Sequence, residues 1–487
     1  MKIEKLTVTE IRDGIKNGSF TAYEVITSLF KRIKDIDPKV QSYLTLCEES
    51  AIKKAKSVDE KIAKGEELGA LCGVPIAIKD NICIDNVTTT CASKMLEDFI
   101  PPYDATVIKN LLKEDAIIIG KTNMDEFAMG SSTENSSFQV TKNPWDLTRV
   151  PGGSSGGSAA CVAAGLAPIS LGSDTGGSIR QPASFCGVVG LKPTYGLVSR
   201  FGLIAFGSSL DQIGPFAKNV TDAALTLQVI QGEDPLDSTT NKDYVPKADY
   251  LKSIDEGVKN MKIGVPKEFF SDALDEEVKA ALLDSIEKLK NLGAEVEEFS
   301  LPITEAGLSA YYIISSAEAS SNLARFDGIR YGYRTKEFAD VNELMIKSRT
   351  EAFGPEVKRR IMLGTYALSS GYYDAYYKRA QKLQKKLKEE FKKSFEKYDI
   401  ILSPTSPTPA FKCGERCSDP LQMYLADIYT ININLAGVPA LSLPYSFSKE
   451  GLPISVQIIG PHFGEEKIFK LAYALEKEAK VSTLAEI

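Results

Sequence analysis

Hydrophobic positions in the first 65 residues follow a helical period. Two Thr–Glu pairs, Thr7 with Glu10 and Thr21 with Glu24, come directly before apolar residues spaced mostly three or four apart. This is the pattern of a capping box, which satisfies free N–H groups where a helix begins. A third amphipathic stretch ends at Gly65. The segment 1–65 is therefore predicted to be helical.

Farther along, the pattern changes to short apolar runs separated by helix-like segments, which is typical of an α/β sheet. Strands are predicted at 74–78, 116–119, 188–191, 262–266, 400–402, 440–443 and 454–459. With no repeat and no long linker, we predict one large α/β domain over 1–487. Its parts are N-terminal helices (1–65), a catalytic core (about 60–220), a largely helical insertion (about 270–397) and a return to the sheet (398–487).

Residues 130 to 215 are rich in glycine, serine and threonine. Such a segment could be a flexible linker. However, a helix candidate at 159–167 and a strand candidate at 188–191 interrupt it, which favours closely packed loops.

Composition is that of an ordinary globular protein, with 43% hydrophobic and 25% charged residues. The net charge of -7 argues against a broad nucleic-acid-binding face. A lysine-rich helix pattern at 372–397 could contact nucleic acid, but its interspersed glutamates favour a solvated face. There is no run of 18 apolar residues and no export signal at the start, so no membrane contact and a cytoplasmic location are expected.

Eight cysteines in a chain of this length predict reduced thiols rather than a disulfide scaffold. Cys413 and Cys417 could clip a metal ion. A closed zinc site usually takes four ligands, however, and no second Cys or His pair accompanies them. We therefore predict no metal site.

Candidate chemistry lies in two serine loops, 152–158 and 174–180. A serine hydroxyl needs a base to take its proton, and histidine is the usual one. The single histidine, His462, lies far downstream in a turn-like segment. Lys79 ends an apolar run, and burial there would make its amine neutral enough to act as the base.

The second loop can also supply donors for a developing oxyanion. Thr175, Gly176 and Gly177 directly precede Ser178, and glycines let successive N–H groups turn toward one point. Ser154 in the first loop could relay a proton between Ser178 and Lys79. Each signal alone is weak, since a glycine–serine string is more often a flexible loop, and Lys79 could simply reach solvent. The two loops, 24 residues apart, form a composite motif.

This composite motif, Gly152–Ala160 followed by residues 174–183, resembles the amidase signature family. The resemblance implies a mixed, twisted β-sheet flanked by helices. It also implies a triad with Lys79 as base, Ser154 as a bridging serine after a cis peptide bond, and Ser178 as nucleophile.

Within that family, residues 319–332, 356–365 and 426–427 resemble the glutaminase subunits of tRNA-dependent amidotransferases. The resemblance implies hydrolysis of glutamine to ammonia, which passes to a B subunit in a complex with B and C subunits. There ATP and Mg²⁺ activate Glu-tRNA(Gln) or Asp-tRNA(Asn), and the B subunit holds the misacylated tRNA. It implies no cofactor in this chain.

Free glutamine is a zwitterion, so a selective pocket needs a cation for its carboxylate and an anion for its ammonium. The resemblance implies Arg360 and Asp427 for these roles, with Tyr311 also contacting glutamine. Three alternatives stay open: Arg359 or Tyr312 could face the pocket instead of its neighbour, and Asp427 could be a local cap. Two rival functions are a stand-alone amidase for small or fatty amides and a scaffold protein with inert loops.

Overall fold

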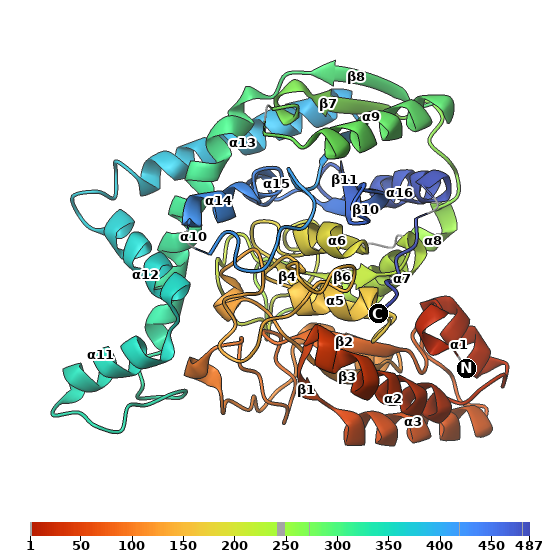
Figure 1. The fold of residues 1–487 in the computed structure, drawn as a ribbon, viewed down its shortest axis with the longest axis horizontal. Helices are drawn as coiled ribbons and strands as arrows, with labels where there is room; N and C mark the ends of the chain where they lie inside the picture. The colour runs from red at the N-terminus through yellow and green to blue at the C-terminus, as the bar shows by residue number, and fades with distance from the viewer. Residues whose placement is uncertain (1, 241–248, 272, 418, 480) are drawn as a thin grey trace.

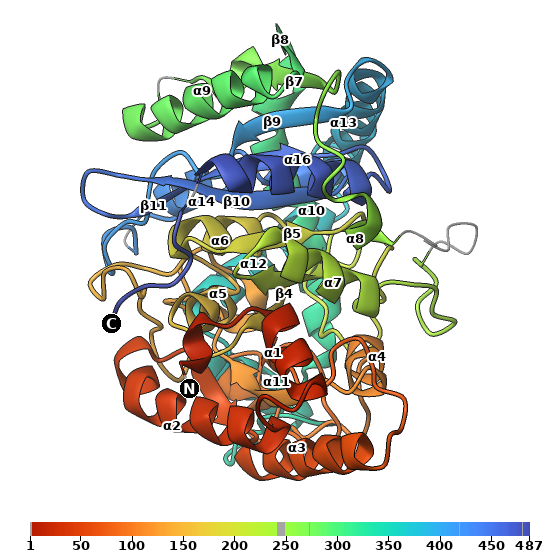
Figure 2. The same cartoon turned by 90° about the vertical axis from the view of Figure 1, so that its right-hand side faces the viewer.

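The computed structural model describes residues 2–240, 249–271, 273–417, 419–479 and 481–487. Within them one mixed sheet of eleven strands crosses the molecule from one end to the other (Figures 1 and 2). The strands are β1 (Tyr43–Leu46), β2 (Pro75–Lys79), β3 (Ile117–Thr122), β4 (Ile169–Asp174), β5 (Val189–Lys192), β6 (Gln212–Ala217), β7 (Lys262–Pro266), β8 (Glu295–Phe299), β9 (Ile400–Pro404), β10 (Ala440–Phe447) and β11 (Pro453–Ile459). The predicted α/β class with a single mixed sheet is confirmed.

The strand order is β1-β3-β2-β4-β6-β5-β10-β11-β9-β7-β8. The strands β3, β2 and β4 run parallel, the strands from β4 through β6, β5, β10 and β11 to β9 pair antiparallel, and β9, β7 and β8 are parallel again. Because β2 and β4 are parallel neighbours, Lys79 and Asp174 at their carboxyl ends lie at the same edge of the sheet.

The helices pack on both the sheet and one another (Figure 1). They are α1 (Val8–Lys16), α2 (Ala22–Val40), α3 (Glu48–Ala63), α4 (Thr106–Lys113), α5 (Gly156–Ala163), α6 (Arg180–Cys186), α7 (Val220–Ile230), α8 (Tyr250–Ser253), α9 (Glu276–Asn291), α10 (Gly307–Asn322), α11 (Val341–Ala352), α12 (Pro355–Leu368), α13 (Tyr377–Lys397), α14 (Pro420–Leu425), α15 (Ile431–Ala436) and α16 (Glu465–Ala479). Short 3-10 turns, η1 to η6, cover Ile3–Lys5, Lys94–Leu96, Glu126–Ala128, Lys267–Phe269, Pro302–Ala306 and Leu323–Arg325. No helix in the described ranges is long and apolar enough to cross a membrane.

The N-terminal helices form as predicted, and both capping boxes are present. Thr7 and Thr21 each accept a hydrogen bond from the N–H of the glutamate three residues later, and each glutamate side chain accepts in return. However, the segment 1–65 also contains the four-residue strand β1, which pairs antiparallel with β3.

Helices α10 to α13 form the arm seen at the left of Figure 1. The insertion predicted over about 270–397 contains this arm, but it also contains α9 and the edge strand β8. The sequence of β8, Glu-Val-Glu-Glu-Phe, exposes three of its five residues, so it carries no apolar run that would predict a strand. The arm joins the body through an apolar cluster that includes Phe127, Phe326 and Phe353.

The loops between 130 and 215 are packed, and the linker interpretation is wrong. All residues from 150 to 194 are buried, including both serine loops. They surround α5, which is built of small residues and lies against β4. Small side chains therefore allow backbone to approach backbone here, as the packed-loop prediction requires.

Candidate active site

Lys79 ends β2 with its ammonium group inside the protein. Its Nζ donates hydrogen bonds to the hydroxyls of Ser154 and Ser155, both at 2.8 Å, and to that of Ser173 at 3.0 Å. The side chain is fully buried. Burial lowers the pKa of Lys79 to about 7, although Asp125 and Asp174 nearby oppose the change. At neutral pH a large share of Lys79 is therefore uncharged and able to accept a proton.

Ser154 is held by a loop with an unusual backbone. The Gly153–Ser154 peptide bond is cis, as the family resemblance implies. The N–H of Gly153 donates to Gln181 Oε1 at 3.0 Å, and the carbonyl of Ser154 accepts from the N–H of Asp125 at 3.1 Å. A Cβ on Gly153 would lie 2.1 Å from Asp125 Oδ2, so a larger residue would not fit there. These contacts fix the Ser154 hydroxyl against Lys79.

Ser178 lies in a turn organised by the carboxylate of Asp174. Asp174 accepts from the N–H of Gly177 at 2.8 Å and that of Ile179 at 3.1 Å. Arg180, also buried, forms an ion pair with Asp174 at 3.1 Å. Burial alone would raise the pKa of Asp174, but Arg180 outweighs it and holds the value at about 2. The turn that presents Ser178 is thus braced by a carboxylate that stays ionised.

Of the three triad residues, Ser178 alone has measurable exposure, at 8%, against 0% for Lys79 and Ser154. The two serine loops touch where the N–H of Ser155 donates to the carbonyl of Ser178 at 3.3 Å. Within the described residues the Ser178 hydroxyl has no hydrogen-bond partner. Its position at the surface of the site leaves it open to a ligand.

The N–H groups around Ser178 divide into two sets. Gly177, predicted as an oxyanion donor, instead donates its N–H to Asp174. The N–H groups of Thr175, Gly176 and Ser178 have no acceptor in the described part of the chain. The carbonyl of Gly176 is turned away, because it accepts from the hydroxyl of Thr430 at 2.7 Å.

Tyr311, on α10, lies directly over this nest. A Cβ on Gly176 would lie 2.4 Å from the Tyr311 ring, so glycine at 176 makes room for the aromatic side chain. Tyr311 is 5% exposed, whereas Tyr312 turns to stack on Tyr424 with ring centroids 4.0 Å apart. The structure therefore places Tyr311, not Tyr312, against the nest.

Arg360, on α12, is the buried member of the arginine pair. Its residue is 4% exposed, while the side chain of Arg359 is 43% exposed. Its Nε donates to Glu356 Oε1 at 2.7 Å, and the guanidinium lies 4.6 Å from the Tyr312 ring centroid and 4.8 Å from that of Tyr424. Burial opposes the charged form, but these neighbours raise the pKa of Arg360 above its ordinary value. The site thus contains a buried, permanently charged cation.

Asp427 supplies the opposite charge. It is 8% exposed and accepts from the hydroxyl of Ser131 at 2.6 Å. Burial raises its pKa to about 7, against the opposing effects of Ser131 and Arg360. Burial also raises the pKa of Tyr311, which Arg360 lowers and Asp427 raises. Arg360 lies over the Tyr312 ring, whose centroid is 5.1 Å from that of Tyr311. The hydroxyl of Thr430 donates to the carbonyls of both Asp427 and Gly176, which places Asp427 beside the nest.

The remaining candidates lie in different surroundings. His462 is beside Gly437, and burial with the nearby cations Lys192 and Lys388 lowers its pKa. Cys413 and Cys417 are free thiols, and Lys142 Nζ lies 3.8 Å from the sulfur of Cys413. Across the described ranges no group of three or more His, Cys, Asp or Glu side chains is arranged to hold a metal ion.

Sequence reasoning missed several residues that shape the site. Asp174 lies within the motif, but the motif does not indicate that its carboxylate accepts from the N–H groups beside Ser178. Glu356 stands four residues before Arg360, and this helical spacing could have identified it as a partner. Asp125 and Ser131 lie outside both loops, and nothing in their local sequence connects them to Ser154 or Asp427.

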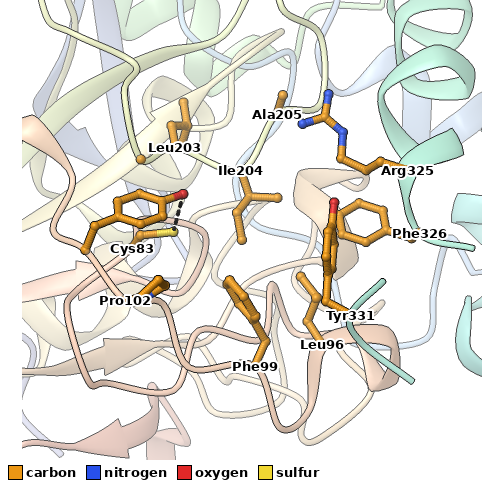
Figure 3. Close-up of a pocket in the computed structure, with 12 residues that line it drawn as sticks. Cys83, Leu96, Phe99, Pro102, Leu203, Ile204, Ala205, Arg325, Phe326 and Tyr331 are labelled. Carbon is orange, nitrogen blue, oxygen red and sulfur yellow. Dashed lines mark hydrogen bonds between the residues drawn. The ribbon is translucent and has the colours of Figure 1, made fainter. Parts of the chain in front are cut away.

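A separate cavity of about 330 Å³ is lined by the loops that follow β2 and β5 and by the segment that follows α10 (Figure 3). Aromatic and aliphatic side chains dominate its lining, among them Phe99, Tyr103, Phe326 and Tyr331, with Arg325 as its cation. None of the predicted site residues lines it.

The model of the Amidase family matches residues 24–469. The second A subunit of glutamyl-tRNA(Gln) amidotransferase in Clostridium acetobutylicum is 70% identical over 98% of this chain and 100% of its own length. The corresponding A subunit of Alkaliphilus metalliredigens is 63% identical over 98% of this chain and 97% of its own. The crystal structure of the A subunit of glutamyl-tRNA(Gln) amidotransferase from Thermotoga maritima superposes with a TM-score of 0.81 at 42% identity, covering 100% of this chain and 99% of that one.

Proposed function

Because the chain belongs to the amidase family, we propose that it is the glutaminase component of a tRNA-dependent amidotransferase. It hydrolyses the side-chain amide of glutamine and supplies the ammonia that converts Glu-tRNA(Gln) to Gln-tRNA(Gln). The names of relatives that align over 97–100% of their own length favour this function over a stand-alone amidase. Conversion of Asp-tRNA(Asn) by the same ammonia is a second use of the same chemistry.

The observation that carries the proposal is the pair of buried opposite charges beside the serine nest. Arg360 suits the carboxylate of free glutamine and Asp427 suits its ammonium, while Tyr311 packs against Gly176. A simple aliphatic amide has neither charge, so an amidase for such substrates has no use for this pair. Arg360 donates to Glu356 and Asp427 accepts from Ser131, so both side chains are held in place for a ligand.

The proposed reaction begins when Ser178 Oγ attacks the side-chain carbonyl carbon of glutamine. Its proton passes through the Ser154 hydroxyl to neutral Lys79 Nζ, which is 2.8 Å from Ser154 Oγ. The N–H groups of Thr175, Gly176 and Ser178 receive the oxyanion. The C–N bond then breaks, and the proton returns through Ser154 to the leaving nitrogen, which departs as ammonia. Water hydrolyses the resulting ester by the same route and releases glutamate.

We propose that the partners follow from this division of labour. Ammonia moves to a B subunit, which binds the misacylated tRNA and uses ATP and Mg²⁺, and a C subunit completes the complex in the cytoplasm. The chain itself then needs no cofactor. The relatives are named as one subunit of an amidotransferase, which supports an assembly with other subunits.

A substrate comparison tests the proposal. The full-length chain, assembled with its partner subunits, is assayed for ammonia release from glutamine and from a simple aliphatic amide. We expect glutamine to be strongly preferred in kcat/KM. Equal rates for the two substrates would favour the stand-alone amidase. Failure of a serine-directed acylating reagent to label Ser178 would favour an inert scaffold.

A further inference from the structure

The segment that follows β3, residues 123–135, contacts both the bridging serine Ser154 and the substrate-binding candidate Asp427. The N–H of Asp125 donates to the carbonyl of Ser154 at 3.1 Å. The Asp125 carboxylate in turn accepts from the N–H of Thr133 at 2.9 Å, which closes the segment on itself. Within this closed loop, Ser131 donates to Asp427 at 2.6 Å. One short segment thus holds Ser154 at one point and Asp427 at another.

Glu126, the residue after Asp125, connects the same segment to the arm. Its side chain is buried, with 1% exposure. Oε1 accepts from the hydroxyl of Ser93 at 2.5 Å, and Oε2 accepts from the N–H of Gly354 at 2.8 Å. A buried carboxylate is costly unless it is hydrogen-bonded, and here both oxygens are. Nothing in the proposed reaction uses this residue.

Gly354 is the N-cap of α12, the helix that carries Arg360. A carboxylate at a helix N-terminus is favourable, because free N–H groups and the helix dipole meet there. The fit is close, since a Cβ on Gly354 would lie 2.4 Å from Glu126 Oε2. Its backbone, with φ of -72°, is open to any residue, so contact with Glu126 is the constraint at this position.

From these contacts we propose that Glu126 is a positioning residue that fixes the start of α12, and through it Arg360, relative to Ser178. The inference rests on the proposed function. The path is short: Glu126 holds Gly354, Glu356 follows within the first turn, and Glu356 accepts from Arg360 Nε at 2.7 Å. On the other side, Asp125 is joined to Ser154.

Other contacts keep the arm in place when Glu126 is removed. Phe127 packs edge-on against Phe353 with centroids 5.7 Å apart. Farther along α12, Gly364 packs against the backbone of α10, where a Cβ would lie 1.9 Å from Ser316 O. Loss of Glu126 therefore frees the first turn of α12 without detaching the helix. Glutamine binding, which needs Arg360, should suffer more than the reactivity of Ser178.

The test compares variants of the full-length chain in the assembled complex. Glu126→Ala should raise KM for glutamine at least tenfold, while kcat and the rate of Ser178 acylation by a small uncharged reagent stay within threefold. Glu126→Gln is the matched control, because its amide oxygen can accept from Gly354 and its amide nitrogen can donate to Ser93. Its KM should stay within threefold of wild type.

A second pair of variants separates positioning from general stability. Gly354→Ala should raise KM for glutamine, because the new methyl group meets Glu126. In a Glu126→Ala background the same substitution should have almost no further effect, since the space is then free. If Glu126→Ala does not fold, Gly354→Ala alone carries the test, and a wild-type KM in that variant would overturn the inference.

The outcomes are distinguishable. If the wild-type complex hydrolyses glutamine and Glu126→Ala has the same KM as wild type, this inference is overturned and the proposed function stands. If Glu126→Ala raises KM and lowers kcat and the Ser178 acylation rate by similar factors, Glu126 has a general structural role and the inference is also overturned. A wild-type complex that does not hydrolyse glutamine would refute the proposed function, and this inference with it.

Discussion

Two buried cations in this molecule have similar burial and opposite electrostatic outcomes. Lys79 is surrounded by the hydroxyls of Ser154, Ser155 and Ser173, and no carboxylate among the described residues bonds to it directly. Arg360 has Glu356 at 2.7 Å and lies between two tyrosine rings. Burial lowers the pKa of Lys79 to about 7, whereas the neighbours of Arg360 keep it charged.

The difference teaches what each region is suited to do. A base must be neutral to accept a proton, so the catalytic region offers Lys79 neutral hydrogen-bond partners. A carboxylate-binding group must stay charged, and arginine with a carboxylate and aromatic faces does so. Desolvation acts on both groups: it outweighs the nearby carboxylates at Lys79, and it is outweighed by the neighbours of Arg360.

Removing the nucleophile of the catalytic region should give the greatest loss of activity. Ser178→Ala should abolish glutamine hydrolysis, because it removes the attacking hydroxyl, and Ser178 alone of the triad residues is exposed. The fold should persist, since Ser178 makes no side-chain hydrogen bond in the described structure. Ammonia-dependent amidation by the assembled complex should therefore survive. Wild-type glutamine turnover in this variant would end the assignment.

Replacing Lys79, the proposed base, should give the next largest loss of activity. Lys79→Ala should lower kcat/KM at least about a hundredfold, the scale of general acid–base catalysis. Lys79→Arg should do comparable damage, because a guanidinium does not lose its proton near neutral pH. His462→Asn is the control and should stay within a few-fold of wild type. A larger loss of kcat/KM in His462→Asn than in Lys79→Ala would contradict the Lys–Ser–Ser mechanism.

Removing the charged pair tests the other region. Arg360→Ala and Asp427→Ala should each lower kcat/KM for glutamine at least about thirtyfold, since losing a charged partner in a desolvated site costs roughly 2–5 kcal/mol. Acylation of Ser178 by a small uncharged reagent should change little in either variant. If Asp427→Ala uses glutamine normally, Asp427 is structural. Normal use by both variants would point to a general amidase.

The two regions also differ in how much of them the sequence predicts. The catalytic region is compact in sequence: Lys79 ends an apolar run, and both serine loops lie within a 32-residue span, 152–183. Apolar runs predict its strands β2, β3 and β5 but not β4 and β6. The sequences of these two, Ile-Ser-Leu-Gly-Ser-Asp and Gln-Ile-Gly-Pro-Phe-Ala, carry small and polar residues. These strands are buried beside the loops, where small side chains are needed for close packing.

The recognition region is assembled from distant segments, and local pattern could not settle it. Adjacent residues Arg359 and Arg360 look equivalent in sequence, and only tertiary packing buries one of them. The bonds from Ser131 to Asp427 and from Glu126 to Gly354 span 296 and 228 residues. Such contacts depend on how distant segments of the chain pack together, which no helical or strand period encodes.

A pH profile gives the smallest and sharpest test of the comparison. The lowered pKa of Lys79 makes it neutral above about 7, and the raised pKa of Asp427 makes it charged above about 7, so raising the pH through 7 favours both active forms. Glutamine use needs both groups, whereas acylation of Ser178 by an uncharged reagent needs Lys79 alone. Well below pH 7, kcat/KM for glutamine should therefore fall with a slope approaching two on a log plot, and the acylation rate with a slope near one. Asp427→Asn should reduce the slope for glutamine to one. Equal slopes in the wild type would mean that Asp427 keeps its charge throughout, and that in the recognition region electrostatic partners outweigh desolvation for the anion as well as for the cation.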